Sequence, residues 1–212
     1  MGMITKGLRA VLAGVYVSIG CIAYVRASNV IFGMLMFSAC MAAIAMFNLP
    51  LFTGRVYRVV IVPSNRVFRT VFELAIMWFC NFLGCYVVSK CLILVRYVSI
   101  VEKRCIEISI HRIADGPLGL FILGLGCNMV LYLAFRASRD RDDLVGTLMI
   151  MLASMVYIDC GFEHSIADAF FMMMGHLTFP DRFQVLLPVA LGNGVGAVIP
   201  ALILDRQYER IG

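Results

Sequence analysis

The chain alternates long apolar runs with short polar segments. Six of the runs are close to, or longer than, the ~20 residues that a helix needs to cross the hydrocarbon core of a bilayer. They cover about residues 8–25, 30–47, 70–95, 117–135, 144–175 and 183–204, and so occupy most of the 212 residues. The pattern predicts an all-α membrane protein with six transmembrane helices, folded as one domain over residues 1–212.

Two of these runs are interrupted by residues that disrupt helices. The second run leads into NLPLFTGR (Asn48 to Arg55), and the fifth contains DCGFEHS (Asp159 to Ser165). Proline removes an amide donor and glycine loosens a helix. Bare backbone at membrane depth is tolerated only where it is buried in protein or lines a wet cavity. Because the breaks fall in the second run of each half, they predict inverted repeats over about 1–95 and 112–204, with a solute path between them.

Composition supports the membrane assignment and excludes several other classes. Hydrophobic residues make up 62% of the chain and charged residues 15%, whereas soluble domains have about a quarter charged. The eight cysteines lie mostly inside the apolar runs without a C-x-x-C pair, as expected for small buried hydrophobic residues. We predict no cofactor and no metal site, and we expect the protein to lie in a lipid bilayer.

Lysine and arginine are distributed unequally between the two sets of loops. Eleven lie on the side of the two termini, six lie on the other side, and Lys90 lies inside the third run. Cytoplasmic loops carry the excess of these residues, so we predict an inner (cytoplasmic) membrane protein with both termini in the cytoplasm. The net charge of +5 then reflects orientation and requires no nucleic-acid partner.

The ionisable residues of the second break are the strongest candidates for chemistry. Glu163 and His164 follow Gly161 within an apolar run. Ionisable groups inside a membrane are costly and usually face a cavity or a partner. A membrane enzyme is disfavoured because no second histidine stands at helical spacing and no HExxH motif is present. A channel for neutral solutes of the aquaporin type stays as the alternative, although neither break contains its Asn-Pro-Ala motif.

Several segments closely resemble motifs of the formate–nitrite transporter family. GFEHSIADAF resembles the family's GFEHS-(I/V)-A-N-M-F signature, and PLFTG resembles its L-F-T-G/S loop. CNFLG, GCNMV and LGNGVG are similar to its motifs in the third, fourth and sixth helices and occur in the same order. The resemblance implies an aquaporin-like protomer with its own pore, assembled as a homopentamer. It also implies passage of small monovalent weak-acid anions: formate first, then nitrite, hydrosulfide, acetate or lactate.

The resemblance also implies roles for particular residues. The central pore histidine falls on His164, and the loop threonine that bonds toward it falls on Thr53. A lysine that draws anions into a vestibule corresponds to Arg112. The apolar constriction corresponds to Phe37, Leu51, Phe52 and Tyr157.

One departure concerns Asp168, which stands where the family usually has asparagine. An ionised Asp168 facing the path would repel anions, unless it pairs with an arginine or is neutral. Glu163, beside His164, is also assigned to the pore path, although we favour a structural role in which its carboxylate accepts bonds from exposed amides of the break.

The resulting hypothesis is that His164 relays charge between two apolar gates, with protons accompanying the anion and Thr53 orienting the ring. Thr53 could instead cap the helix after its break. Arg112 could belong to a plain solvated loop. The sequence does not distinguish a channel from a proton-coupled transporter.

Overall fold

The computed structural model describes residues 2–141 and 143–208, and its regular elements are all helical within that part of the chain. Arg210, one of the eleven basic residues counted above, lies outside the described residues. The helices are α1 (Met3–Arg26), α2 (Val30–Met46), α3 (Arg58–Ile61), the 3₁₀ helix η1 (Ser64–Arg66), α4 (Val67–Leu92), α5 (Val98–Ala114), α6 (Gly116–Asp140), α7 (Leu144–Asp159), α8 (Ser165–Met174) and α9 (Phe179–Tyr208).

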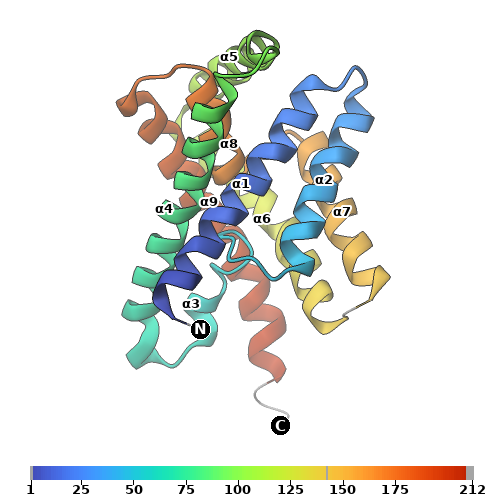
Figure 1. Cartoon of the computed structure of the whole chain (residues 1–212). Helices are drawn as coiled ribbons and strands as arrows, with labels where there is room; N and C mark the ends of the chain where they lie inside the picture. Colours follow the sequence, from blue (N-terminus) through green and yellow to red (C-terminus); the bar gives the residue numbers. More distant parts are fainter. Residues whose placement is uncertain (1, 142, 209–212) are drawn as a thin grey trace.

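Within the described residues, four helical segments are long and apolar enough to cross a membrane by length and composition. They are Ile4–Arg26, Ser64–Leu92, Gly116–Asp140 and Phe179–Asp205, and they correspond to the first, third, fourth and sixth predicted runs. The second predicted run forms the shorter helix α2, and the fifth forms the two helices α7 and α8. The start of α1 and the end of α9 lie at one end of the molecule, whereas α5 lies at the other (Figure 1).

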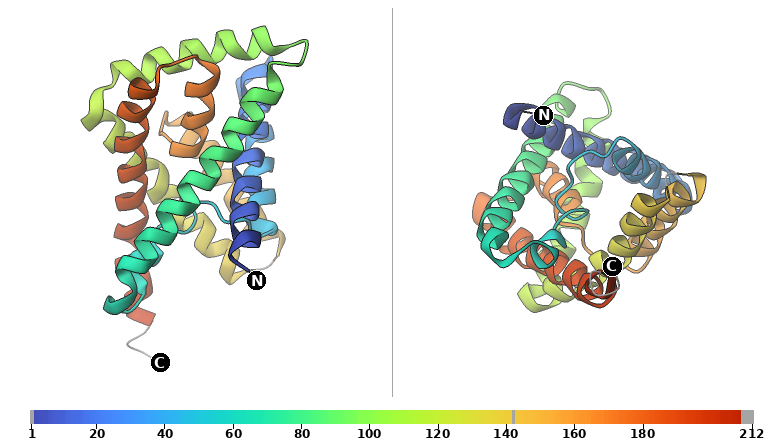
Figure 2. Two further views of the ribbon diagram at one scale, coloured as in Figure 1. Left: turned by 60° about the vertical axis from the view of Figure 1, so that its left-hand side comes forward. Right: turned by 90° about the horizontal axis from the view of Figure 1, so that it is seen from below.

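The long helices pack in close pairs because glycines bring their backbones together. A Cβ added at Gly14 of α1 would lie 1.9 Å from the carbonyl oxygen of Asn81 in α4. A Cβ at Gly192 of α9 would lie 2.1 Å from the carbonyl oxygen of Phe121 in α6. Such contacts leave no room for a side chain, as is typical of helix pairs in membranes. The two pairs flank the centre of the molecule, where the segments between α2 and α3 and between α7 and α8 lie (Figure 2).

The segment VEKRCIEISIHRIAD corrects one expectation. The sequence analysis left open a plain solvated loop here, but this segment lies in α5, which crosses one end of the molecule (Figure 2). Its buried face consists of Val101, Cys105 and Ser109, which recur every four residues as on one side of a helix. This face packs against α8. The charged residues between these positions obscure the stripe, and α5 places Arg112 in its last turn.

Candidate functional site

The side chain of Asn81, in α4, holds the backbone of the first non-helical segment. Its amide nitrogen donates to the carbonyl oxygens of Ala10 and Pro50, at 2.7 and 2.9 Å. Its amide oxygen accepts from the N–H of Phe52 at 2.9 Å. One fully buried side chain therefore satisfies two polar backbone groups of the non-helical segment, at Pro50 and Phe52, and ties the segment to α1.

Asn193, in α9, makes the same set of bonds to the second non-helical segment. Its amide nitrogen donates to the carbonyl oxygens of Gly124 and Glu163, at 2.8 and 2.9 Å. Its amide oxygen accepts from the N–H of Ser165 at 3.0 Å. The expectation that the Glu163 carboxylate supports these amides is wrong, because Asn193 supports the Ser165 amide and the Glu163 carboxylate has another partner.

A third buried asparagine links the first segment to Asn193, which in turn holds the second segment. The amide nitrogen of Asn128, in α6, donates to the carbonyl oxygen of Thr53 at 3.1 Å and to that of Asn193 at 2.7 Å. The sequence analysis singled out the motifs that contain these asparagines but assigned no role to the side chains. The signal available was an asparagine within three apolar runs, which by itself does not identify the bonding partner.

His164 and Thr53, 111 residues apart in the sequence, meet at the centre of the molecule. The Nε2 atom of His164 lies 2.9 Å from the Oγ1 atom of Thr53, and both side chains are buried. The Nδ1 atom of His164 accepts the N–H of Ala167 at 3.2 Å, so His164 is the N-cap of α8. Because Nδ1 accepts a bond, the proton of the neutral ring lies on Nε2, and Nε2 donates to the Thr53 hydroxyl. Thr53 does not cap α3, whose N-cap residue is Tyr57.

Gly161 allows the turn that places His164 at the start of α8. Its φ of +67° lies in the left-handed region, which glycine adopts without the steric cost that other residues incur. The N–H of Phe162 then bonds back to the carbonyl oxygen of Tyr157 at 2.9 Å. The glycine in the GFEHS motif is therefore required by backbone conformation.

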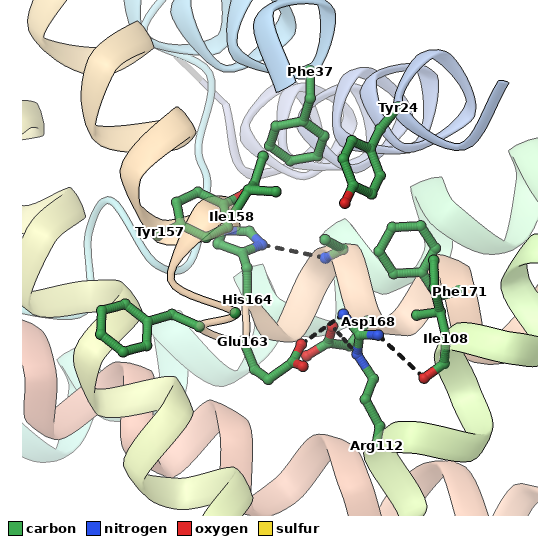
Figure 3. Close-up of a pocket in the computed structure, with 13 residues that line it drawn as sticks. Tyr24, Phe37, Ile108, Arg112, Tyr157, Ile158, Glu163, His164, Asp168 and Phe171 are labelled. Atoms are coloured by element: carbon green, nitrogen blue, oxygen red, sulfur yellow. Dashed lines mark hydrogen bonds and ion pairs between the residues drawn. The ribbon is translucent and has the colours of Figure 1, made fainter. Parts of the chain in front are cut away.

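A cavity of about 200 Å³ lies beside His164 on the side facing α5. Tyr157 stacks on the His164 ring with 5.9 Å between centroids, and Phe37 meets Tyr157 edge-on at 6.1 Å. The hydroxyl of Tyr157 is buried and has no hydrogen-bond partner among the described residues. Tyr24 and Phe171 complete much of the aromatic wall (Figure 3). The sequence analysis missed Tyr24, which stands in an ordinary apolar run.

Arg112 joins two carboxylates at the far wall of this cavity (Figure 3). Its Nη2 atom lies 2.7 Å from Oε2 of Glu163, and its Nε atom donates to Oδ1 of Asp168 at 2.9 Å. The exposed fractions of the three side chains are 15% for Arg112, 9% for Glu163 and 0% for Asp168. The sequence analysis considered that Asp168 could repel anions, pair with an arginine or be neutral. In the structure it pairs with Arg112. One guanidinium is enclosed with two carboxyl groups.

A second cavity, of about 510 Å³, lies toward the other end of the molecule. Phe37 lines the first cavity and Ile44 the second, and seven residues of a helix span about 10 Å. Leu51 and Gly54 lie at the inner wall of the second cavity, and Phe135 contributes from α6. Three arginines also line it: Arg55, Arg58 and Arg139.

The structure gathers most of the residues singled out from the sequence. Phe37, Tyr157, Glu163, His164, Asp168 and Arg112 line the first cavity. Leu51 lines the second, and Thr53 lies between the two through its bond to His164. Phe52 lines neither cavity and packs instead against a separate apolar cluster that includes Val56 and Leu74. Among the described residues, no group of three or more His, Cys, Asp or Glu is arranged to hold a metal ion.

Comparison with known proteins identifies the family. The sequence profile described as "Formate/nitrite transporter" matches residues 2–204. The chain therefore belongs to the formate/nitrite transporter family, and its apolar helices are those of a multi-pass membrane protein.

Curated relatives are channels and transporters. The chain is 26% identical over 230 residues to the formate channel FocA of Escherichia coli (strain K12), a match covering 88% of this chain and 80% of that protein. It is 29% identical over 128 residues to the formate channel BtFdhC of Bacillus thuringiensis, covering 56% and 48%. A probable formate transporter of Methanothermobacter thermautotrophicus is 35% identical over 85 residues, covering 37% of this chain and 31% of that protein. The matches thus span from about a third to four fifths of these relatives.

Solved structures have the same fold. A "Pentameric formate channel with formate bound" superimposes with a TM-score of 0.78 at 22% identity, covering 98% of this chain and 96% of that one. An "FNT family ion channel" gives a TM-score of 0.80 at 19% identity, covering 96% and 90%.

Proposed function

We propose that this protein is a membrane channel or transporter for small monovalent anions of weak acids, with formate as the first candidate. Nitrite, hydrosulfide, acetate and lactate follow. The observation that carries the proposal is the His164–Thr53 hydrogen bond. This polar pair lies between the aromatic wall of Phe37 and Tyr157 on one side and Leu51 on the other. A buried polar pair placed between apolar collars suits a solute that must give up its hydration shell.

We further propose six membrane spans arranged as two inverted repeats. In this arrangement α2 with the segment after it forms the second span, and α7 with α8 forms the fifth. The matching bonds of Asn81 and Asn193 support this arrangement, because each braces one break with an equivalent set of donors and acceptors. The helices α2 and α7 also correspond in how they begin, because each has an N-cap side chain, Asn29 and Asp143, that accepts a backbone N–H of the first turn. These two helices run in opposite directions (Figure 1).

In the proposed path, a solute enters past Arg112, crosses the Phe37–Tyr157 wall, meets His164 and Thr53, and leaves past Leu51. The tautomer of His164 limits what the ring can do. A second ring proton at Nδ1 would face the N–H of Ala167, and two donors cannot share a bond. We therefore infer that neutral His164 donates from Nε2 to Thr53, which leaves the Thr53 proton for a substrate oxygen. Protonation of the ring then requires the first turn of α8 to release the Ala167 amide, and proton coupling proceeds through that step.

The proposal includes a homopentamer in an inner membrane with both termini in the cytoplasm. The excess of basic residues at the end where α1 begins supports the orientation. Large apolar side chains exposed on the outer faces of the helices suit contact with lipid or neighbouring subunits.

The test is uptake of each of the five anions into proteoliposomes at several pH values. We expect saturable formate uptake by the wild type, and its loss or replacement by an unsaturable leak in His164→Ala and Thr53→Val. The matched control is His111→Ala, which changes an exposed histidine of α5 and is expected to retain wild-type uptake. Well-folded wild-type protein that passes none of these anions would contradict the proposal.

A second candidate is a channel for small neutral solutes. The favouring observation is that the charge of Arg112 is already matched by Glu163 and Asp168. Stopped-flow measurement of glycerol and urea entry into the same proteoliposomes distinguishes the two functions. Rapid entry of a neutral solute without formate uptake would select this second function.

A further inference from the structure

We propose that Arg55, Arg58 and Arg139 form an anion-binding site in the second cavity, on the other side of Leu51 from His164. The ligand class is a small free oxyanion or halide, such as a monovalent carboxylate. The site makes the two ends of the path electrically unequal. This inference rests on the proposed function for its role in transport, although the binding itself does not depend on transport.

The first argument is that the three guanidinium groups have no acidic partner among residues 2–141 and 143–208. Of the residues that the structure describes, no Asp or Glu lines the second cavity. Within the described residues, the ion pairs of the structure involve other cations and none of these three arginines. Arg58 and Arg139 line the same cavity as Arg55, and like charges repel one another. Three like charges at one cavity wall are a strong attraction for an anion.

The second argument is that neutral groups hold two of the three arginines. The Nη2 atom of Arg55 donates to Oδ1 of Asn48 at 2.7 Å and to its carbonyl oxygen at 3.2 Å. The guanidinium carbon of Arg139 lies 4.3 Å from the centre of the Tyr57 ring. These contacts orient the guanidinium groups without cancelling their charge. A guanidinium offers paired N–H donors that match a carboxylate.

The third argument is the contrast with the other end of the path. Arg112 is enclosed with Glu163 and Asp168, so an anion arriving there finds a cation whose charge is already matched. In the second cavity, the described lining side chains carry a formal charge of three positive units, one from each arginine. At equal anion concentrations on the two sides of the membrane, we therefore expect anions to occupy the second cavity, next to Leu51, more than the first.

The shape of the second cavity favours a small free anion over a lipid headgroup. Leu51, Gly54 and Phe135 form part of its wall, and all three are buried. A volume of about 510 Å³ is within the range of small-ligand sites. The site also adjoins Leu51, so a bound anion is placed at the inner constriction of the proposed path.

The test is direct binding, measured by the ³⁵Cl NMR line width of chloride with the protein in zwitterionic detergent. The probes are chloride and formate. We expect excess broadening with the wild type, displacement of chloride by formate, and loss of most of the broadening in Arg58→Gln/Arg139→Gln. Arg58→Lys/Arg139→Lys keeps both charges and is expected to retain most of the broadening. Arg55 is left unchanged because it holds Asn48 in place.

The matched control is Arg66→Gln, which removes an exposed arginine of η1 outside the second cavity. It is expected to leave the formate-sensitive broadening unchanged. Equal broadening in the wild type and the double glutamine variant would overturn the site, whether or not the protein transports formate. A difference that emerges only after anionic lipid is added would overturn it too, because the site would then bind lipid.

Transport then tests the proposed asymmetry separately. In planar bilayers of zwitterionic lipid, formate added to one side and then to the other is expected to give unequal wild-type currents at low ionic strength. The double glutamine variant reduces the inequality, and about 1 M salt suppresses it. Chloride binding without any formate current would leave the site standing and contradict the proposed function. Equal currents from both sides of the wild type would overturn the asymmetry.

Discussion

The two cavities contain the same kind of cation in different surroundings. At the α5 end, Arg112 is enclosed with two carboxyl groups, one of them fully buried. At the other end, a larger cavity is lined by Arg55, Arg58 and Arg139 and, within the described part of the chain, by no acidic side chain. The field that a solute meets therefore depends on the partners that the fold brings to each arginine, and not on the number of arginines alone.

Asp168 accounts for much of this difference. It stands where asparagine is usual among the motifs that the sequence resembles, and it adds a second negative group to the Arg112–Glu163 pair. An asparagine at this position could still accept a bond from Nε of Arg112 without contributing charge. One residue therefore changes the electrostatics of one cavity while leaving its hydrogen bonds almost intact.

Removing Arg112 is expected to have the largest effect. Arg112→Met leaves Glu163 and Asp168 as buried carboxyl groups without their cation, and breaking a buried ion pair in this way costs about 3–5 kcal/mol of unfolding free energy. Thermal and denaturant unfolding in detergent measure the loss. Arg66→Met, at an exposed position, is the control and should change little. A stable Arg112→Met protein would show that the two carboxyl groups do not depend on this cation.

Asp168→Asn is expected to have the next largest effect. It removes one negative group from the first cavity, so formate entry from the α5 end should increase by roughly an order of magnitude at low ionic strength. Currents in planar bilayers, with formate on either side, measure the change. The control is Asp143→Asn, since Asp143 is an exposed N-cap of α7 and asparagine caps equally well. Unchanged entry would mean that Asp168 carries no charge in the wild type.

Tyr157→Phe is expected to have the smallest effect and tests whether the first cavity is part of the path. The buried Tyr157 hydroxyl lines that cavity without a partner among the described residues. If it donates to a passing solute, its removal weakens apparent formate affinity by about 1 kcal/mol, roughly fivefold. Tyr132→Phe is the matched control, because that hydroxyl donates to Asp205 at 2.6 Å. This control should lose stability and keep its affinity, and an unchanged affinity in Tyr157→Phe would place the solute elsewhere.

Some of the candidate site could be predicted from local sequence features. Pro50 and Gly161 mark backbone that cannot continue as a regular helix, and they lie close to Thr53 and His164 in the sequence. The resemblance then placed these two side chains together, and the structure gives them a bond of 2.9 Å. The six-span inverted repeat stays a prediction, supported by the matching bonds of Asn81 and Asn193.

Other features could not be predicted because their partners are distant in the sequence. Glu163 lies 51 residues from Arg112, and nothing near Glu163 in the sequence indicates that its carboxylate leaves the break to reach α5. The family resemblance placed Phe52 with Leu51 in one apolar constriction. Its side chain instead packs against a separate apolar cluster that includes Val56 and Leu74.

The sequence by itself determined that the chain is a helical membrane protein, where its helices break, and which residues resemble a family motif. These properties follow from composition, from the length of apolar runs, and from the backbone preferences of proline and glycine, all of which are local. Only the tertiary structure decided which groups face each other: Asn81 and Asn193 the two breaks, and Arg112 two carboxyl groups. It also gathered three arginines in a cavity that no described acidic residue lines. The reason is physical, because the energy of a buried polar or charged group depends on the partner that packing supplies.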